Sequence, residues 1–124
     1  KGGASRLTAD EIAPIGGEMC YQIPVDNPTA DSMSVSYALP LPVGTEYVSH
    51  TGGEFADGEW TWQNRDLASD SSFSGELCVQ IKGDVEPGTT ITGTAHFILD
   101  GDSFERRVQT RILAPIYLPL TFKP

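Results

Sequence analysis

Apolar residues alternate with polar ones along most of this chain, and this two-residue period constrains the fold more than any other sequence feature. Successive side chains of a β-strand point to opposite faces, so an alternating segment is typical of a strand with one buried face. The clearest apolar rows are Met19, Tyr21, Ile23 and Val25; Met33, Val35, Tyr37 and Leu39; Leu77, Val79 and Ile81; and Ile91, Ala95, Phe97 and Leu99. The sequence therefore predicts a sheet protein with one hydrophobic core.

Turn residues separate these rows at a spacing of about ten residues. Asp100-Gly101 is typical of a tight hairpin, and Leu41-Pro42-Val43-Gly44 ends one strand before another begins at Tyr47. Thirteen glycines and nine prolines fit many short strands better than helices. Seven to nine strands with this spacing predict an all-β, antiparallel sandwich.

The predicted sandwich covers residues 17–113. Residues 7–13 alone resemble a helix, but seven residues cannot form a stable one, so we interpret 1–16 as a lead-in segment or edge strand. Residues 114–124 are a C-terminal strand or tail, in which Pro119 interrupts the apolar run 116–122. The chain begins at Lys1, which suggests a piece of a longer protein.

Charge restricts the partners that we expect. Seventeen acidic residues against eight Lys and Arg give a net charge of −9, which repels phosphate backbones and argues against nucleic-acid binding. The charge is uneven, since residues 104–124 carry a net +3. No apolar run has the length of a membrane span, so we expect no membrane insertion, and we expect a monomer.

Cys20 and Cys78 form the most informative pair of side chains. Each lies one residue out of phase with the apolar row of its own strand, next to Tyr21 and Leu77 respectively. If the two strands are antiparallel neighbours, the thiols on their outer face come within disulfide range. A disulfide would place the protein in an oxidising compartment, and two free thiols are the alternative.

Trp60 and Trp62 flank Thr61 and therefore point to the same face of a strand. Two indoles in a row could stack on sugar rings and form a ligand platform. The other interpretation is that both tryptophans fill the core. Burial of both side chains favours a structural module, and exposure of both favours carbohydrate binding.

We predict no catalytic residue, metal ligand or cofactor site. His50 and His96 follow no zinc or nucleophile pattern, and the acidic clusters at 54–59, 84–86 and 100–105 do not match an EF-hand loop. Bound calcium at these clusters is the alternative to scattered surface carboxylates. Arg106 and Arg107 could form an anion patch. The other interpretation is that they place one charge on each face of an edge strand and so protect it against pairing with another strand.

The order of the motifs over residues 16–112 resembles a bacterial surface-repeat family, the domain of unknown function eleven. The matching features are Gly17, Tyr21, Asn27, Leu41-Pro42-Val43-Gly44, Tyr47-Val48-Ser49, Trp62, Leu67-Ala68, the strand 77–81, Gly88, Ile91 and Ala95. Asp70 stands where the family pattern has glycine, and Gly93 where it has asparagine. Tyr117-Leu118-Pro119-Leu120 also resembles the extreme C-terminus of some secreted bacterial proteins.

The family resemblance implies an Ig-like β-sandwich, often in tandem, in secreted or cell-surface bacterial proteins, and it implies no catalytic residues. We therefore expect a structural spacer or adhesion module. Its partners would be neighbouring domains of the same polypeptide, and a cell-surface glycan or protein. The alternative is an accessory module, for carbohydrate among other ligands, appended to a secreted enzyme such as a peptidase.

Overall fold

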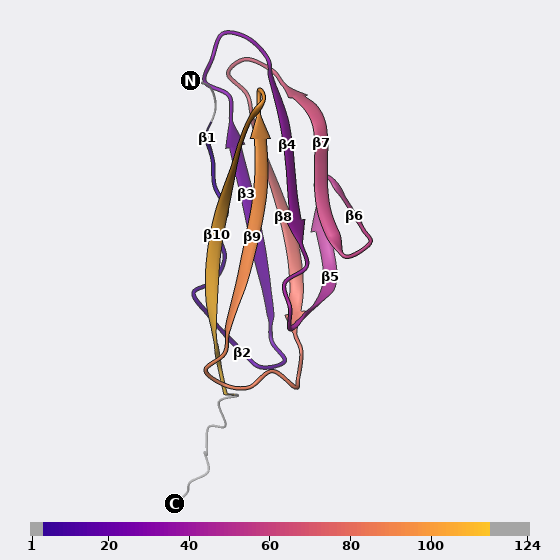
Figure 1. The fold of residues 1–124 in the computed structure, drawn as a ribbon, viewed down its shortest axis with the longest axis vertical. Helices are drawn as coiled ribbons and strands as arrows, with labels where there is room; N and C mark the ends of the chain where they lie inside the picture. The colour runs from indigo at the N-terminus through magenta and orange to yellow at the C-terminus, as the bar shows by residue number, and fades with distance from the viewer. Residues whose placement is uncertain (1–3, 115–124) are drawn as a thin grey trace, which may run out of the picture.

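A computed structural model describes residues 4–114, with the side chains of Ala4, Ser5 and Asn64 left aside. Ten strands form two sheets (Figure 1). They are β1 (Ala4–Ser5), β2 (Ile12–Pro14), β3 (Glu18–Asp26), β4 (Met33–Pro40), β5 (Thr45–Thr51), β6 (Glu54–Ala56), β7 (Glu59–Leu67), β8 (Ser72–Ile81), β9 (Thr90–Leu99) and β10 (Asp102–Leu113). The all-β prediction is confirmed. Residues 4–114 contain no helix, hence none long and apolar enough to cross a membrane.

Four strands form one sheet in the order β1-β3-β8-β5, and six form the other in the order β2-β10-β9-β4-β7-β6. Neither sheet closes on itself, so each keeps two edges. The expectation of purely antiparallel sheets is wrong at one place, because β2 pairs in parallel with the last three residues of β10. The strand count also exceeds the predicted seven to nine, because three of the strands have only two or three residues.

The core lies between the two sheets and consists of the apolar rows seen in the sequence. Tyr21 and Ile23 of β3 are fully buried, as are Trp60 of β7 and Phe97 of β9. The two layers are in close contact. A side chain at Gly93 would meet the ring of Tyr21 at 2.6 Å, so β9 carries a glycine where the tyrosine of the other sheet packs.

The lead-in segment contributes an edge strand to each sheet. β1 pairs with the end of β3, and Thr8 pairs with Gln22. The chain then crosses to the other sheet, where β2 lies beside β10. Leu7 and Ala13 are buried in the common core, so this segment is packed with the sheets that follow. The predicted C-terminal strand or tail lies, apart from residue 114, outside the described residues.

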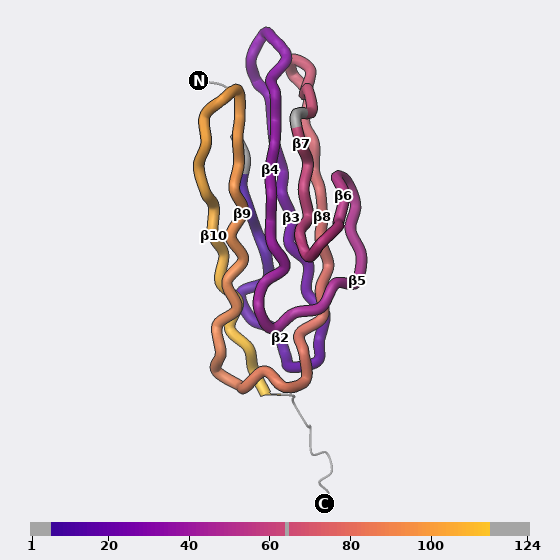
Figure 2. The backbone as a smooth tube through the Cα atoms, turned by 45° about the vertical axis from the view of Figure 1, so that its right-hand side comes forward, coloured from indigo at the N-terminus to yellow at the C-terminus, as the bar shows by residue number. Residues whose placement is uncertain are grey.

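The described chain enters and leaves the fold at opposite ends of its long axis. β1 lies beside the end of β3, near one pole, whereas β10 ends near the other pole (Figures 1 and 2). The turn that begins β10 has the predicted hairpin geometry, with positive φ angles of 50° at Asp100 and 87° at Gly101. From this turn, β10 runs along the long axis and ends near the pole opposite β1.

Candidate functional site

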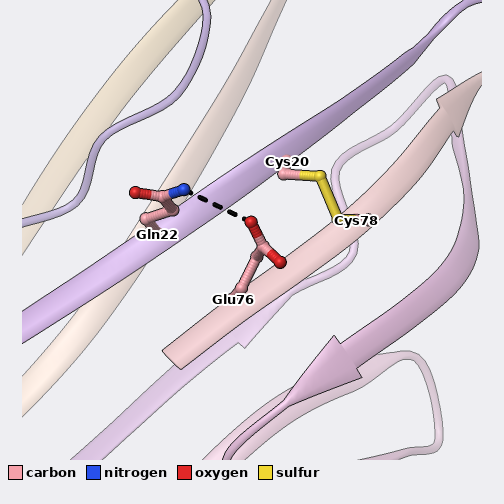
Figure 3. The surroundings of a disulfide bond; sticks show 4 residues. All are labelled: Cys20, Gln22, Glu76 and Cys78. Atoms are coloured by element: carbon pink, nitrogen blue, oxygen red, sulfur yellow. Dashed lines mark hydrogen bonds between the residues drawn. A yellow bond between two sulfur atoms is a disulfide. The ribbon is translucent and has the colours of Figure 1, made fainter. Parts of the chain in front are cut away.

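The most distinctive group of side chains is the disulfide between Cys20 and Cys78 on the outer face of the four-stranded sheet (Figure 3). The two residues are directly opposite each other in the antiparallel pairing of β3 with β8, with Cα atoms 4.0 Å apart. This is the strand pairing that the out-of-phase cysteines predicted. The bond joins residues 58 positions apart in sequence and fixes the register of two central strands.

Polar side chains continue along the same face beside the disulfide. The side-chain amide of Gln22 donates to a carboxylate oxygen of Glu76 at 3.2 Å (Figure 3). Cys20 is half-buried and Cys78 is 8% exposed. Glu76 lies close enough to both sulfur atoms to complete a three-ligand metal set. In the oxidised protein, however, the sulfur atoms are bonded to each other and are not thiolates, so they are not metal ligands.

Of the two interpretations of the tryptophan pair, the structure agrees with core filling and not with a ligand platform, because both side chains are in the core. Trp60 is fully buried and Trp62 is 9% exposed. The indole N–H of Trp60 donates to the carbonyl of Gly52 at 2.8 Å. Trp62 stacks on Phe73 with ring centroids 3.6 Å apart, and the guanidinium of Arg65 lies 5.4 Å from its ring centroid. No indole face is left for a sugar ring.

An aromatic cluster that sequence reasoning missed lies at the edge formed by β5 and β6. Tyr47 is 40% exposed and stacks on Phe55, with ring centroids 4.2 Å apart. The hydroxyl of Tyr47 is 2.8 Å from Nδ1 of His50. The pairing of β5 with β8 has a register shift between Tyr47 and Ser49, and the period-2 pattern gives no signal of such a bulge.

The second histidine lies in a hollow on the outer face of the six-stranded sheet, lined by residues that include Ser36, Gln63 and His96. Nδ1 of His96 is 3.4 Å from a carboxylate oxygen of Glu105, and both side chains are about half exposed. General-base chemistry needs an ordered, water-shielded arrangement with preorganised donors for the developing charge. This pair is solvated, so its interaction is weak.

The two strongly perturbed titratable groups among the described residues are buried phenols. Burial raises the pKa values of Tyr21 and Tyr37 well above their ordinary value of about 10, and the charge of Arg65 partly offsets the rise for Tyr37. Neither hydroxyl has a protein hydrogen-bond partner within the described part of the chain. Both lie inside the core, so they contribute to stability rather than to an accessible site.

The acidic clusters have local structural roles that can be named. A carboxylate oxygen of Asp100 accepts a hydrogen bond from the backbone N–H of Ser34 at 2.9 Å, which ties the β9–β10 hairpin to β4. Asp57 has a φ of 53° in the β6–β7 turn. The hydrogen bond of Asp100 and the left-handed conformation of Asp57 thus give these two aspartates structural roles in turns.

Comparison with protein-family models gave no match, and comparison with curated proteins gave none. Among solved structures, this chain is similar to part of an alkylpurine DNA glycosylase from Pseudomonas fluorescens bound to DNA with an abasic-site analogue, at 11% identity and a TM-score of 0.44. It is also similar to part of a GH20 exo-β-N-acetylglucosaminidase from Vibrio harveyi, at 15% identity and a TM-score of 0.40. The match to the DNA glycosylase covers 88% of this chain but only 30% of the glycosylase chain. The match to the glucosaminidase covers 92% of this chain but only 19% of the other chain. Likenesses of this size identify neither a family nor an activity.

Proposed function

We propose that this protein is a non-catalytic, Ig-like spacer module of a secreted or cell-surface bacterial protein, of the domain-of-unknown-function-eleven type. The observation that carries the proposal is that the first described strand lies near one pole of the long axis and the last described strand ends near the other. A module with this geometry holds the domains before and after it apart.

The disulfide supports the same role. It joins two central strands, removes 58 residue steps of chain from what can be extended by force, and lowers the entropy of the unfolded chain. Such bonds persist in oxidising compartments, which fits a location outside the cell. The buried tryptophans also favour a structural module over the alternative of an accessory carbohydrate module.

The two departures from the family pattern are compatible with the proposed Ig-like fold. Asp70 has a φ of 59°, so an aspartate takes the left-handed conformation at the position where the pattern has glycine. Gly93 leaves room for Tyr21 where the pattern has asparagine. Asp70 thus keeps the backbone conformation of the pattern, whereas an asparagine at position 93 would not fit beside Tyr21, so the packing there differs from the pattern.

Small-angle X-ray scattering on two copies joined end to end tests the spacer role. β10 alone has a length of about 35 to 40 Å at roughly 3.3 Å per residue. If the exit of one copy is opposite its entry, the tandem has a maximum dimension about twice that of the single copy. A tandem hardly longer than a single copy would mean that the copies fold back side by side, and the spacer proposal would be wrong.

A further inference from the structure

Within residues 4–114, β10 has a long edge that pairs with no other strand. On one side it pairs with β9 over ten residues, without a register shift. On the other side, among the described residues, β2 pairs only with Arg111 to Leu113. The part of β10 before Arg111 therefore lies at the margin of the sheet, as Figure 2 shows.

Hydrogen bonds identify which backbone groups face this margin. The N–H of Arg111 donates to the carbonyl of Glu11, and the carbonyl of Leu113 accepts from Ile15. Backbone groups alternate in direction along a strand, so odd-numbered residues of β10 point away from β9. The N–H and C=O groups of Ser103, Glu105, Arg107 and Gln109 therefore face the margin and pair with no other strand within residues 4–114. The carbonyl of Glu105 accepts a side-chain hydrogen bond from Arg106.

Two arginines, Arg106 and Arg107, place positive charge along this edge. Arg106 lies 4.5 Å from the ring centroid of Phe104 and donates to the carbonyl of Glu105 at 3.0 Å, so its guanidinium covers one of the edge groups. Arg107 lies 3.4 Å from the carboxylate of Glu105. Consecutive residues point to opposite faces, so an arriving strand meets a guanidinium on each face of the sheet.

The positive charge of the two arginines favours some pairing strands over others. A second copy that pairs antiparallel through the same edge can place only one residue opposite its own equivalent, because the two strands run in opposite directions. With Arg106 at that position, the two Arg106 side chains would face each other, which is destabilising, and Arg107 would face Glu105 of the other copy. An acidic strand would instead place carboxylates against both guanidinium groups, which favours bidentate contacts. Phe104 and Val108, which are half-buried on the inner side, would pack against apolar residues of the same strand.

We propose that the free edge of β10, from Ser103 to Gln109, binds an extended acidic segment of a partner protein by strand addition. The segment carries two consecutive acidic residues opposite Arg106 and Arg107, and apolar residues two positions away on the inner face. On binding, the guanidinium of Arg106 leaves the carbonyl of Glu105 and contacts a carboxylate of the partner. This inference is independent of the spacer role.

Three blocked ten-residue peptides test it against the whole protein. The first has a central Glu-Glu pair flanked by alternating threonine and valine. The second has Lys-Lys at the centre, and the third keeps Glu-Glu but has proline on both sides, so that it cannot form a ladder. Binding is followed by NMR, through shifts and hydrogen-exchange protection of the backbone amides of Glu105 and Arg107, at low and high salt.

We expect the first peptide alone to bind and to protect these amides, with affinity that falls as salt rises. The double variant R106A/R107A should weaken binding tenfold or more. The double variant R65A/K82A, which removes the same charge from exposed positions elsewhere, should stay within twofold of the original protein.

Four results would overturn the proposal. One is equal binding of the lysine or proline peptide. The second is protection on β5 or β7 in place of β10. The third is the absence of protection at millimolar peptide. The last is self-association of the protein that protects β10 without peptide, which would make this edge an interface between copies.

Discussion

Asn27 offers the sharpest test of the packing at one pole of the molecule. It is 1% exposed and follows the last residue of β3. Its side-chain amide N–H₂ lies within hydrogen-bond distance of three carbonyl oxygens, those of Asp31, Leu67 and Ala68, at 2.8 to 3.1 Å. Its side-chain oxygen accepts two hydrogen bonds from Thr29. One side chain thus joins the turn after β3 to the end of β7.

Asn27→Asp is nearly isosteric but replaces the donor group by an oxygen that faces three carbonyls. Each buried carbonyl left without its donor costs about 1 to 3 kcal/mol. We therefore expect Asn27→Ala to lose about 3 kcal/mol. Asn27→Asp should lose about 1 to 2 kcal/mol more at neutral pH, because the carboxylate is buried and repelled.

The deficit of Asn27→Asp should depend on pH in one direction. Burial and the facing carbonyls raise the pKa of the new carboxyl above its unfolded value of about 3.9. The native state of the variant therefore binds the proton more tightly than the unfolded state. The stability deficit shrinks as pH falls toward and below about 4, by about 1.4 kcal/mol for each unit of pKa elevation.

Urea denaturation followed by tryptophan fluorescence measures both effects, since both indoles are buried in the folded protein. The free energy of unfolding of each variant is compared with that of the original protein at pH 7.5 and pH 3.5. Asn27→Ala is the control, because its deficit should change little between the two pH values. An Asn27→Asp variant within 0.5 kcal/mol of the original protein at pH 7.5, or with a deficit independent of pH, would refute this reasoning.

Three further predictions concern stability. Replacing both Cys20 and Cys78 by alanine should lower the free energy of unfolding by about 4 kcal/mol in the chain-entropy model, and an unchanged urea midpoint would contradict it. Tyr21→Phe and Tyr37→Phe should cost less than about 1 kcal/mol, because neither hydroxyl has a hydrogen-bond partner among the described residues. The stability of the original protein should fall above pH 10, where the phenols of the unfolded chain ionise and the two buried ones do not. Ionisation of all four tyrosines near pH 10 without unfolding, followed by absorbance, would be inconsistent with this. Gly53→Ala should destabilise by more than 1 kcal/mol in the same urea assay, since φ is 68° and a Cβ atom would lie 2.4 Å from the carbonyl oxygen of Thr61; a neutral effect would mean that this corner differs from the structure described.

The sequence predicted those parts of the fold that depend on a two-residue period. The apolar rows of β3, β4, β8 and β9 are buried as expected, because alternation alone decides which face of a strand meets the core. The disulfide was predictable for the same reason. Cys20 and Cys78 are each one residue out of phase with the apolar row of their own strand, which places both on the outer face, where they form the bond.

Other features depend on contacts between segments far apart in sequence. β2 is parallel to β10 because the lead-in crosses from one sheet to the other, and no local pattern encodes that crossing. The bulge between Tyr47 and Ser49 shifts the pairing of β5 with β8 by one residue. Asn27 gave no sign of its buried network, since its partners lie up to 41 positions away. Trp60 and Trp62 could be placed on one face from the sequence, but only the opposite sheet decides that this face is buried.

Single-molecule force spectroscopy tests the central claim, that a disulfide-clamped module holds its neighbours apart along its long axis. The molecule is pulled from both ends, with and without a thiol reductant. The bond between Cys20 and Cys78 should withhold 58 residue steps from extension, so reduction should lengthen the chain released on unfolding by about 200 Å at roughly 3.6 Å per residue. A cooperative unfolding event that lengthens by this amount on reduction agrees with the claim. The same extension in both conditions, or extension without any cooperative event, would contradict it.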